Sequence, residues 1–252
     1  MLTSYRPPDH PWHRGLWFSW KYINKVNYWE ENRETAEAGG KTGWSVPRLE
    51  TRPDFSARLT LDLTYQPAKG TVVLSEHRVI SISAPDRTGA YSLDWTMTFR
   101  AADGDLELDR TPPVDSQGRN VSGGYAGLGL RASGDFRDVK VVTVDGPARY
   151  DNYRFRGKSP ALDFSGKIGN QTAGVAFLDD SANLNAPSPW YVLNNAPVYF
   201  INPAVLTWQP ERLRAGEMLT LHYRVWVHPG RWTPERLRLA SGQSRILNDP
   251  KN

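Results

Sequence analysis

The fold is decided by ten residues near the C-terminus, 219–228, which read LTLHYRVWVH. Every second residue from Leu219 to Val227 is apolar or aromatic, and the residues between them are Thr220, His222, Arg224, Trp226 and His228. Alternation with a period of two places the two sets of side chains on opposite faces of a β-strand. One apolar and one polar face are typical of a strand in an antiparallel sheet. The stretch therefore predicts a long antiparallel strand.

The same alternation recurs over residues 58–65 and 91–99. Further strands are expected near 71–83, 105–109, 126–132, 138–144, 161–165, 172–178, 190–193 and 198–201, with Gly, Pro and Asp turn signals between them. Helical patterns are limited to a short one from Glu30 to Ala38 and a second one after Thr233, which is expected to end near Ser241. The sequence thus predicts an all-β protein, a large antiparallel β-sandwich with few short helices, as one domain over residues 1–252.

The composition excludes several classes of protein. Hydrophobic residues make up 39% and charged residues 23% of the 252 positions, which excludes a disordered or fibrous chain. No apolar run approaches the roughly 18 residues of a membrane span. There is no cysteine, which excludes disulfides and cysteine nucleophiles. The net charge of +4 comes from scattered basic residues, which argues against a nucleic-acid partner. No signal peptide is visible, and the compartment, cytoplasmic or periplasmic, and the oligomeric state stay open.

The segment 9–31, which reads DHPWHRGLWFSWKYINKVNYWEE, concentrates the side chains that carry chemistry. It holds four of the ten Trp residues and two of the five His residues of the chain. Sugars present C–H faces that stack on aromatic rings and hydroxyls that bind Asn, Glu and Arg side chains. We therefore expect an aromatic cleft for a small-molecule or oligosaccharide substrate. The alternative is a Trp-rich corner of the core in which His10 and His13 only bind backbone groups.

Two kinds of sugar chemistry are open to these residues. A hydrolase needs paired carboxylates, for which Glu30, Glu31 and Glu76 are candidates. A lyase needs a base and a cation that stabilises an enolate-like intermediate, and His10 or His13 with Arg14 or Arg131 would serve. The third possibility is a non-catalytic sugar-binding module. The candidate catalytic residues are thus His10, His13, Arg14, Glu30 and Glu76.

Further residues are candidates for binding the substrate. The polar face of residues 219–228 could form a sugar-binding wall in a concave sheet, or could simply face solvent. In the strand 71–83, Glu76 shares a face with apolar residues, which indicates either a β-bulge or an ion pair with Arg78 that faces a cleft. Gly127 and Gly129 leave room beside Arg131. The full set is Trp17, Asn27, Trp29, Arg131, Asn183, Trp190, Tyr191, His222 and Arg224.

No cofactor is expected, and a divalent metal is the alternative. His10 and His13 could be two ligands, with a third from Glu30, Glu76, His77, His222 or His228. The His-Pro-Trp-His spacing is not a standard metal-binding one.

The chain also resembles a known family. The residues 10–17 (HPWHRGLW), 27–30 (NYWE), 127–131 (GLGLR), 174–179 (GVAFLD) and 223–228 (YRVWVH) are similar to blocks of the PmoA-like family of bacterial proteins. Its members are often catalogued as methane oxygenases, which implies a metal-dependent oxidoreductase as a further alternative. Its architecture is similar to carbohydrate-active proteins with a galactose-mutarotase-like supersandwich. Members usually carry several dozen residues before the first block, so the chain is expected to lack their N-terminal strands. Trp12 stands where members commonly have a further His.

Overall fold

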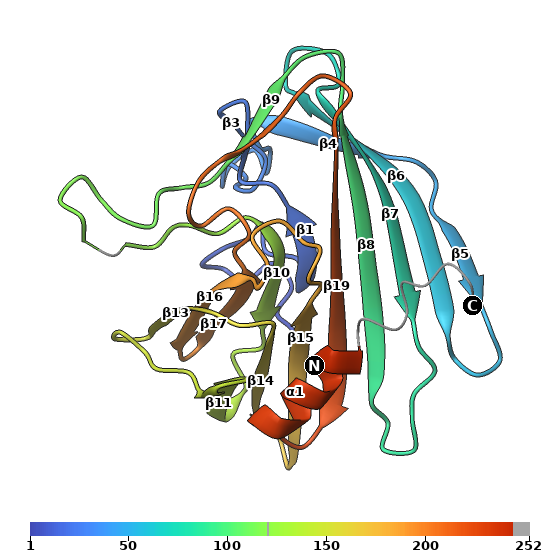
Figure 1. The fold of residues 1–252 in the computed structure, drawn as a ribbon, viewed down its shortest axis with the longest axis vertical. Coiled ribbons are helices and arrows are strands. Elements are labelled where there is room, and N and C mark those ends of the chain that lie inside the picture. Colours follow the sequence, from blue (N-terminus) through green and yellow to red (C-terminus); the bar gives the residue numbers. More distant parts are fainter. Residues whose placement is uncertain (120, 244–252) are drawn as a thin grey trace.

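The computed structural model describes residues 1–119 and 121–243, which form three antiparallel sheets and one helix (Figure 1). The smaller sheet of the sandwich has the strand order β1-β10-β17-β16-β13. Its strands are β1 (Leu16–Ser19), β10 (Gly127–Ala132), β17 (Val198–Pro203), β16 (Pro189–Asn195) and β13 (Arg154–Lys158).

The larger sheet has ten strands in the order β12-β11-β14-β15-β19-β8-β7-β6-β4, and β5 also pairs with β6. In Figure 1, strands β19, β8, β7 and β6 follow one another from the centre to the right. The strands of this sheet are β12 (Gly146–Pro147), β11 (Arg137–Thr143), β14 (Ala161–Ile168), β15 (Gln171–Asp179), β19 (Met218–Pro229), β8 (Tyr91–Ala101), β7 (Leu74–Ile82), β6 (Ala57–Pro67), β4 (Gly40–Trp44) and β5 (Arg48–Thr51).

A third, small sheet consists of β18 (Glu211–Leu213), β9 (Leu106–Asp109), β2 (Tyr22–Ile23) and β3 (Val26–Asn27). The helix α1 (Pro234–Gln243) follows the last strand. It begins as its sequence predicts, with the Thr233 hydroxyl accepting a hydrogen bond from the backbone N–H of Arg236. No helix in the described part of the chain is long and apolar enough to cross a membrane.

The predicted fold class is confirmed, because antiparallel strands account for nearly all regular structure. The short helix expected from Glu30 to Ala38 is wrong. The side-chain oxygen of Asn32 accepts hydrogen bonds from the backbone N–H groups of Glu34 and Thr35, and Ala36 has a left-handed φ of 56°. An Asn side chain that binds nearby backbone groups stabilises a turn instead of a helix.

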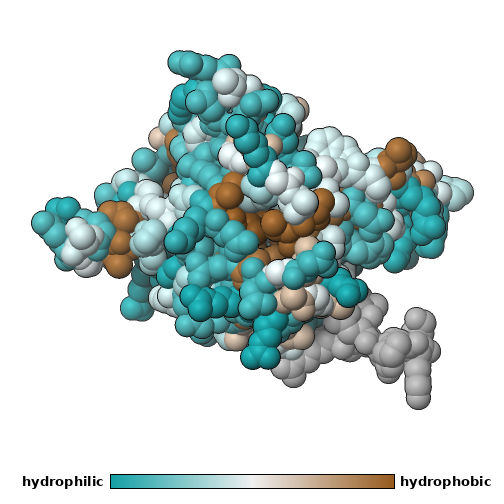
Figure 2. Space-filling model, turned by 90° about the horizontal axis from the view of Figure 1, so that it is seen from above, coloured by the Kyte–Doolittle hydropathy of each residue, from teal (hydrophilic) through white to brown (hydrophobic). Residues whose placement is uncertain are grey.

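The main core lies between the two large sheets and contains alternate residues of their strands. In β15, Val175 and Phe177 point into this core, whereas Ala176 and Leu178 pack on the opposite face with Leu237 of α1. The helix therefore covers part of the outer face of the ten-stranded sheet. Viewed from above, the surface is mostly hydrophilic around a central hydrophobic patch (Figure 2).

A charged pair is buried inside this core. The register of β7 with β6 and with β8 is regular through Glu76, so the β-bulge considered for this strand is absent. The Glu76 side chain is 0% exposed and accepts hydrogen bonds from Arg78 (Nε to Oε1, 2.5 Å) and from the Tyr65 hydroxyl (2.5 Å). The Arg78 guanidinium in turn lies 5.5 Å from the centre of the Trp95 ring. The Glu76 carboxylate is therefore closed to solvent and to any substrate.

Removing one partner of this pair should destabilise the protein strongly. The variant Arg78→Met leaves the Glu76 carboxylate buried without a cation, and we expect a loss of about 3 kcal/mol in the free energy of unfolding. Chemical denaturation measures it. Arg58→Met on the neighbouring strand is the control, because Arg58 is exposed, and should cost less than about 0.5 kcal/mol. The double variant Glu76→Met/Arg78→Met should recover part of the loss. Equal stability of Arg78→Met and Arg58→Met would contradict the account.

Candidate functional site

The segment 9–31 contributes β1 to the five-stranded sheet and β2 and β3 to the small sheet, and several of its side chains lie on the outer face of the five-stranded sheet. Strand β1 pairs with β10 so that Trp17 is opposite Gly129, while Phe18 is opposite Leu128. Because side chains alternate, Phe18 and Leu128 enter the main core, and Trp17 points to the other face. Arg131 has the same parity as Gly129 and faces the same side. This outer face carries the candidate site.

Aromatic rings form the floor of the site. Trp17, Trp29, Tyr191 and Phe200 are all 9% exposed or less and form one cluster, against which Tyr125 packs. The ring centre of Trp29 lies 5.4 Å from that of Trp17 and 5.4 Å from that of Tyr125. A Cβ atom at Gly129 would come within 3.2 Å of both Trp17 and Phe200. The glycine thus makes room for two rings of the protein, not for a ligand.

His10 is held by Asp9 at the edge of this floor. The Asp9 Oδ2 atom lies 2.9 Å from Nδ1 of His10 and accepts a hydrogen bond of 2.7 Å from Nη2 of Arg131. Burial alone would raise the pKa of Asp9, but the hydrogen bonds from His10 and Arg131 outweigh it and lower the pKa. The carboxyl is therefore ionised and can only accept, so Nδ1 of His10 donates to it and Nε2 is the ring nitrogen that Asp9 does not engage. The His10 side chain is 44% exposed.

His13 lies beneath His10 and is buried. Its ring stacks on His10 (4.8 Å between ring centres) and lies 4.6 Å from Trp17. Burial lowers the pKa of His13 to about 3, with further contributions from the charges of His10 and Arg131. His13 is therefore neutral near pH 7 and serves as part of the floor.

Each glutamate at the end of the segment is paired with a cation. The Glu30 Oε1 atom lies 2.6 Å from Nζ of Lys21, and Oε2 accepts a hydrogen bond of 3.0 Å from the Asn27 amide. Burial lowers the pKa of Lys21, and the contact with Glu30 opposes that shift. Glu31 forms an ion pair with Arg14. Both carboxylates are thus neutralised by neighbouring side chains.

Several buried polar atoms around this floor lack a hydrogen-bond partner in the described structure. Other such atoms lie in the main core, for example Trp20 Nε1 and Trp95 Nε1, and ordered water or a ligand can supply the partner of a buried polar atom. The atoms are Trp12 Nε1, His13 Nδ1, Glu31 Oε2, Arg131 Nε and Tyr191 Oη.

The structure brings together one group of the residues selected from the sequence and separates the others. The group at the floor comprises His10, His13, Arg14, Trp17, Asn27, Trp29, Glu30, Arg131 and Tyr191. Glu76 lies in the main core, as described above. Trp190 points the other way from Tyr191 and is 1% exposed, and its Nε1 donates to the Ser159 carbonyl at 2.8 Å.

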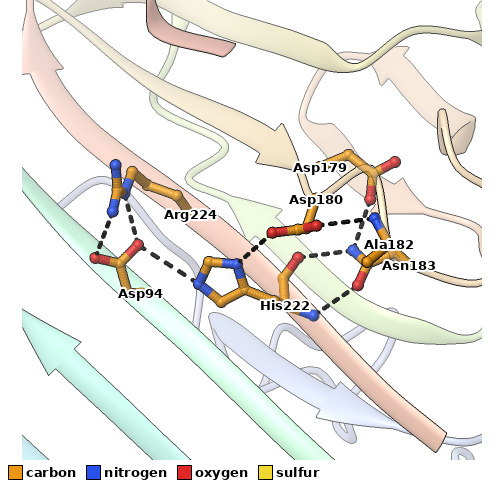
Figure 3. A network of polar contacts seen from close by, with 7 residues as sticks. All are labelled: Asp94, Asp179, Asp180, Ala182, Asn183, His222 and Arg224. Atoms are coloured by element: carbon orange, nitrogen blue, oxygen red, sulfur yellow. Dashed lines mark hydrogen bonds and ion pairs between the residues drawn. The ribbon is translucent and has the colours of Figure 1, made fainter. Parts of the chain in front are cut away.

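Asn183, His222 and Arg224 belong to a second group on the outer face of the ten-stranded sheet (Figure 3). Arg224 donates two hydrogen bonds to Asp94, and Nδ1 of His222 lies 3.2 Å from Asp180. Asn183 binds Asp179 and the His222 backbone. Helix α1 packs on part of this face, where Leu237 belongs to the cluster against which Trp226 packs.

Asp179 lies at the edge of a cavity beside the second group. Burial raises the pKa of Asp179 to about 6, although hydrogen bonds from Asn183 and Ser188 oppose the shift. The cavity has a volume of about 760 Å³ and is lined by residues that include Asp180, Pro187 and Arg238. It lies next to α1.

No group of three or more His, Asp or Glu side chains that could hold a metal ion occurs among residues 1–119 and 121–243. His10 and His13 stack on each other, and Nδ1 of His10 already faces Asp9. The side chains of the site offer hydrogen-bond donors and acceptors to a ligand.

Sequence reasoning missed several residues of the floor. Asp9 directly precedes His10, and this adjacency is a signal that could have found it. Tyr125 follows Gly123 and Gly124 in a stretch whose side chains do not alternate between apolar and polar. Phe200 lies in a strand whose sequence does not distinguish it from a residue of the main core. Lys21 is 1% exposed, although lysine is rarely buried, and nothing in its neighbours marks it.

The fold and site define an all-β sandwich protein with an aromatic, hydrogen-bonding site on its smaller sheet. The chain belongs to a family of unknown function, DUF6807, whose model matches residues 1–241. The resemblance to the PmoA-like family is therefore wrong, because the family model that matches is a different one. The oxidoreductase alternative, which depended on that resemblance, has no remaining basis. No curated protein matches the sequence.

Among solved structures, the fold is similar to a protein from Klebsiella pneumoniae subsp. pneumoniae described as a "putative aldose 1-epimerase". The TM-score is 0.40 and the sequence identity is 8%, over 82% of this chain and 59% of that one. This chain thus spans less than two thirds of that protein's length. At this TM-score the likeness carries no argument, and the fold class rests on the strand pairing itself.

The buried state of His13 predicts how the protein responds to acid. Its pKa is lowered in the folded protein, so between about pH 6.5 and 3 the unfolded chain binds a proton that the folded chain does not. Stability then falls as the pH falls through this window, by up to about 1.4 kcal/mol per pH unit. The variant His13→Phe should show a shallower fall than the wild type in denaturant titrations at pH 4 to 7.

The control for this measurement is His77→Phe, because the His77 side chain is 54% exposed. It should leave the slope of stability against pH close to that of the wild type. In the wild type, NMR of the imidazole nitrogens should find His13 neutral at pH 5. A protonated His13 at that pH would contradict its burial.

Proposed function

We propose that the protein binds a sugar on the aromatic floor of the five-stranded sheet and that His10 transfers a proton to or from it. The observation that carries this proposal is the arrangement of His10, whose Nδ1 faces Asp9 while no hydrogen bond to its Nε2 occurs among the described residues. An imidazole that is oriented by a carboxylate is a common general base.

The floor supports a sugar as the ligand. Trp12 and Tyr125 are partly exposed, unlike the rings beneath them, and aromatic faces of this kind stack on the C–H faces of sugars. Hydroxyl groups both donate and accept, so they match a site whose unpartnered atoms include Trp12 Nε1, a donor, and Glu31 Oε2, an acceptor. A purely apolar ligand would leave these atoms without partners.

The pairing of the acids favours base chemistry of the lyase type over hydrolysis by two carboxylates. A hydrolase of that kind needs one protonated acid and a second carboxylate that is free to act. Here Asp9, Glu30 and Glu31 are bound by Arg131, Lys21 and Arg14 respectively. A cation next to a carboxylate favours its ionised form and so opposes service as an acid.

A non-catalytic sugar-binding module is the second candidate. The observation in its favour is that same pairing, because each of the three carboxylates at the floor has a cation bound to it. The two candidates predict the same binding surface and differ in whether the sugar changes.

The test follows sugars by NMR in D2O in the presence of the wild-type protein and of His10→Asn. With the wild type we expect a carbon-bound proton of at least one mono- or oligosaccharide to exchange or a new product to form. His10→Asn should lower that rate by at least about 100-fold, the usual contribution of a general base, and leave the sugar affinity nearly unchanged. Trp12→Ala should instead weaken binding.

The matched control is His77→Asn, because His77 also pairs with an aspartate, Asp62, at 2.7 Å, but on the ten-stranded sheet. It should behave as the wild type. Binding without any change of the sugar would leave the module as the function. If no sugar binds, or if Trp12→Ala binds as well as the wild type, the proposal fails.

A further inference from the structure

Two arginines at the floor form no ion pair with an acid among the described residues. Arg156 lies over Tyr191, 4.5 Å from its ring centre, and donates to two backbone carbonyls. The other, Arg33, lies beside Trp12. The three carboxylates at the floor are all paired, namely Asp9 with Arg131, Glu30 with Lys21, and Glu31 with both Arg14 and Arg6. Arg33, by contrast, has no carboxylate within ion-pair distance among the described residues, although it lies beside Asp9.

Arg33 is nevertheless held in place. Its Nη2 donates to the Asp9 backbone carbonyl at 2.7 Å and its Nη1 to that of Pro8 at 3.2 Å. Its guanidinium lies 5.6 Å from the centre of the Trp12 ring. The Asp9 carboxylate meanwhile binds His10 and Arg131 instead. Arg33 therefore presents a fixed and uncompensated positive charge beside Trp12.

Donors also outnumber acceptors among the unpartnered atoms near Arg33. Trp12 Nε1 and Arg131 Nε are both buried donors without an acceptor in the described structure. Trp12 packs edge-on against His10, with 5.3 Å between their ring centres, and Arg131 binds the Asp9 carboxylate that also contacts His10. A ligand that satisfies them must be rich in acceptor oxygens.

We propose that the sugar bound at this floor carries a carboxylate, as a uronic acid does, and that Arg33 binds this carboxylate. The inference rests on the proposed function, since it names the class of sugar for the same site. A single guanidinium matches the single charge of a carboxylate and binds its two oxygens through parallel hydrogen bonds. The sugar ring would then lie over Trp12, within reach of His10.

The test is a comparison of binding by isothermal titration calorimetry at low salt. The probes are two matched pairs, glucuronate with glucose and galacturonate with galactose, and the phosphate-bearing glucose 6-phosphate. We expect at least one uronate to bind about tenfold more tightly than its neutral partner, the effect of a hydrogen-bonded charge pair. Arg33→Gln should remove this preference, so that the uronate and its neutral partner bind with equal affinity.

The control is Arg87→Gln, because Arg87 is exposed in the turn between β7 and β8. It should retain the full preference. Equal binding of neutral sugars and uronates would overturn the inference and leave the proposed function standing, whereas no binding of any sugar would overturn both. A preference that persists in Arg33→Gln would overturn the role of Arg33. Tighter binding of glucose 6-phosphate than of glucuronate would overturn the carboxylate as the recognised group.

Discussion

The ion pair between Arg131 and Asp9 is the contact on which the candidate site depends. Arg131 is 3% exposed, and a buried guanidinium without an anion would be costly. The pair joins the loop before β1 to strand β10, 122 residues away in the sequence. It also leaves the Asp9 carboxylate ionised, which fixes the proton on His10. Without this pair, neither the orientation of His10 nor the backbone carbonyls that hold Arg33 would be defined.

The inner face of the five-stranded sheet stabilises the fold, and its outer face carries the candidate site. The inner face supplies the main core with residues such as Phe18 and Leu128. The outer face supplies rings that bury one another and leave a polar rim. The floor is therefore rigid, because its lower rings are packed as tightly as a core, and this rigidity is what positions a few polar groups for a ligand. Substitutions at the rim can change binding without unfolding the sheet.

Alternation of side chains was sufficient to predict the strands and the antiparallel sandwich, since that pattern reports burial directly. The density of Trp and His in residues 9–31 likewise located most of the floor. The sequence of β19 could not predict that its polar face would be partly covered, because the covering element, α1, lies outside the strand. The position of Glu76 was also ambiguous, because an ion pair buried in the core and an ion pair that faces a cleft produce the same sequence pattern. The contact of Asp9 with Arg131 leaves no local trace, because it joins distant segments.

The most direct measurement of the central claim is a crystal structure of the protein soaked with a mixture of sugars. We expect a sugar ring over Trp12, with one of its atoms within about 3 Å of Nε2 of His10. Arg131 should remain bound to Asp9 in that complex. Sugar in the cavity beside Asp179 instead, with none at His10, would contradict the account and move the site to the outer face of the ten-stranded sheet.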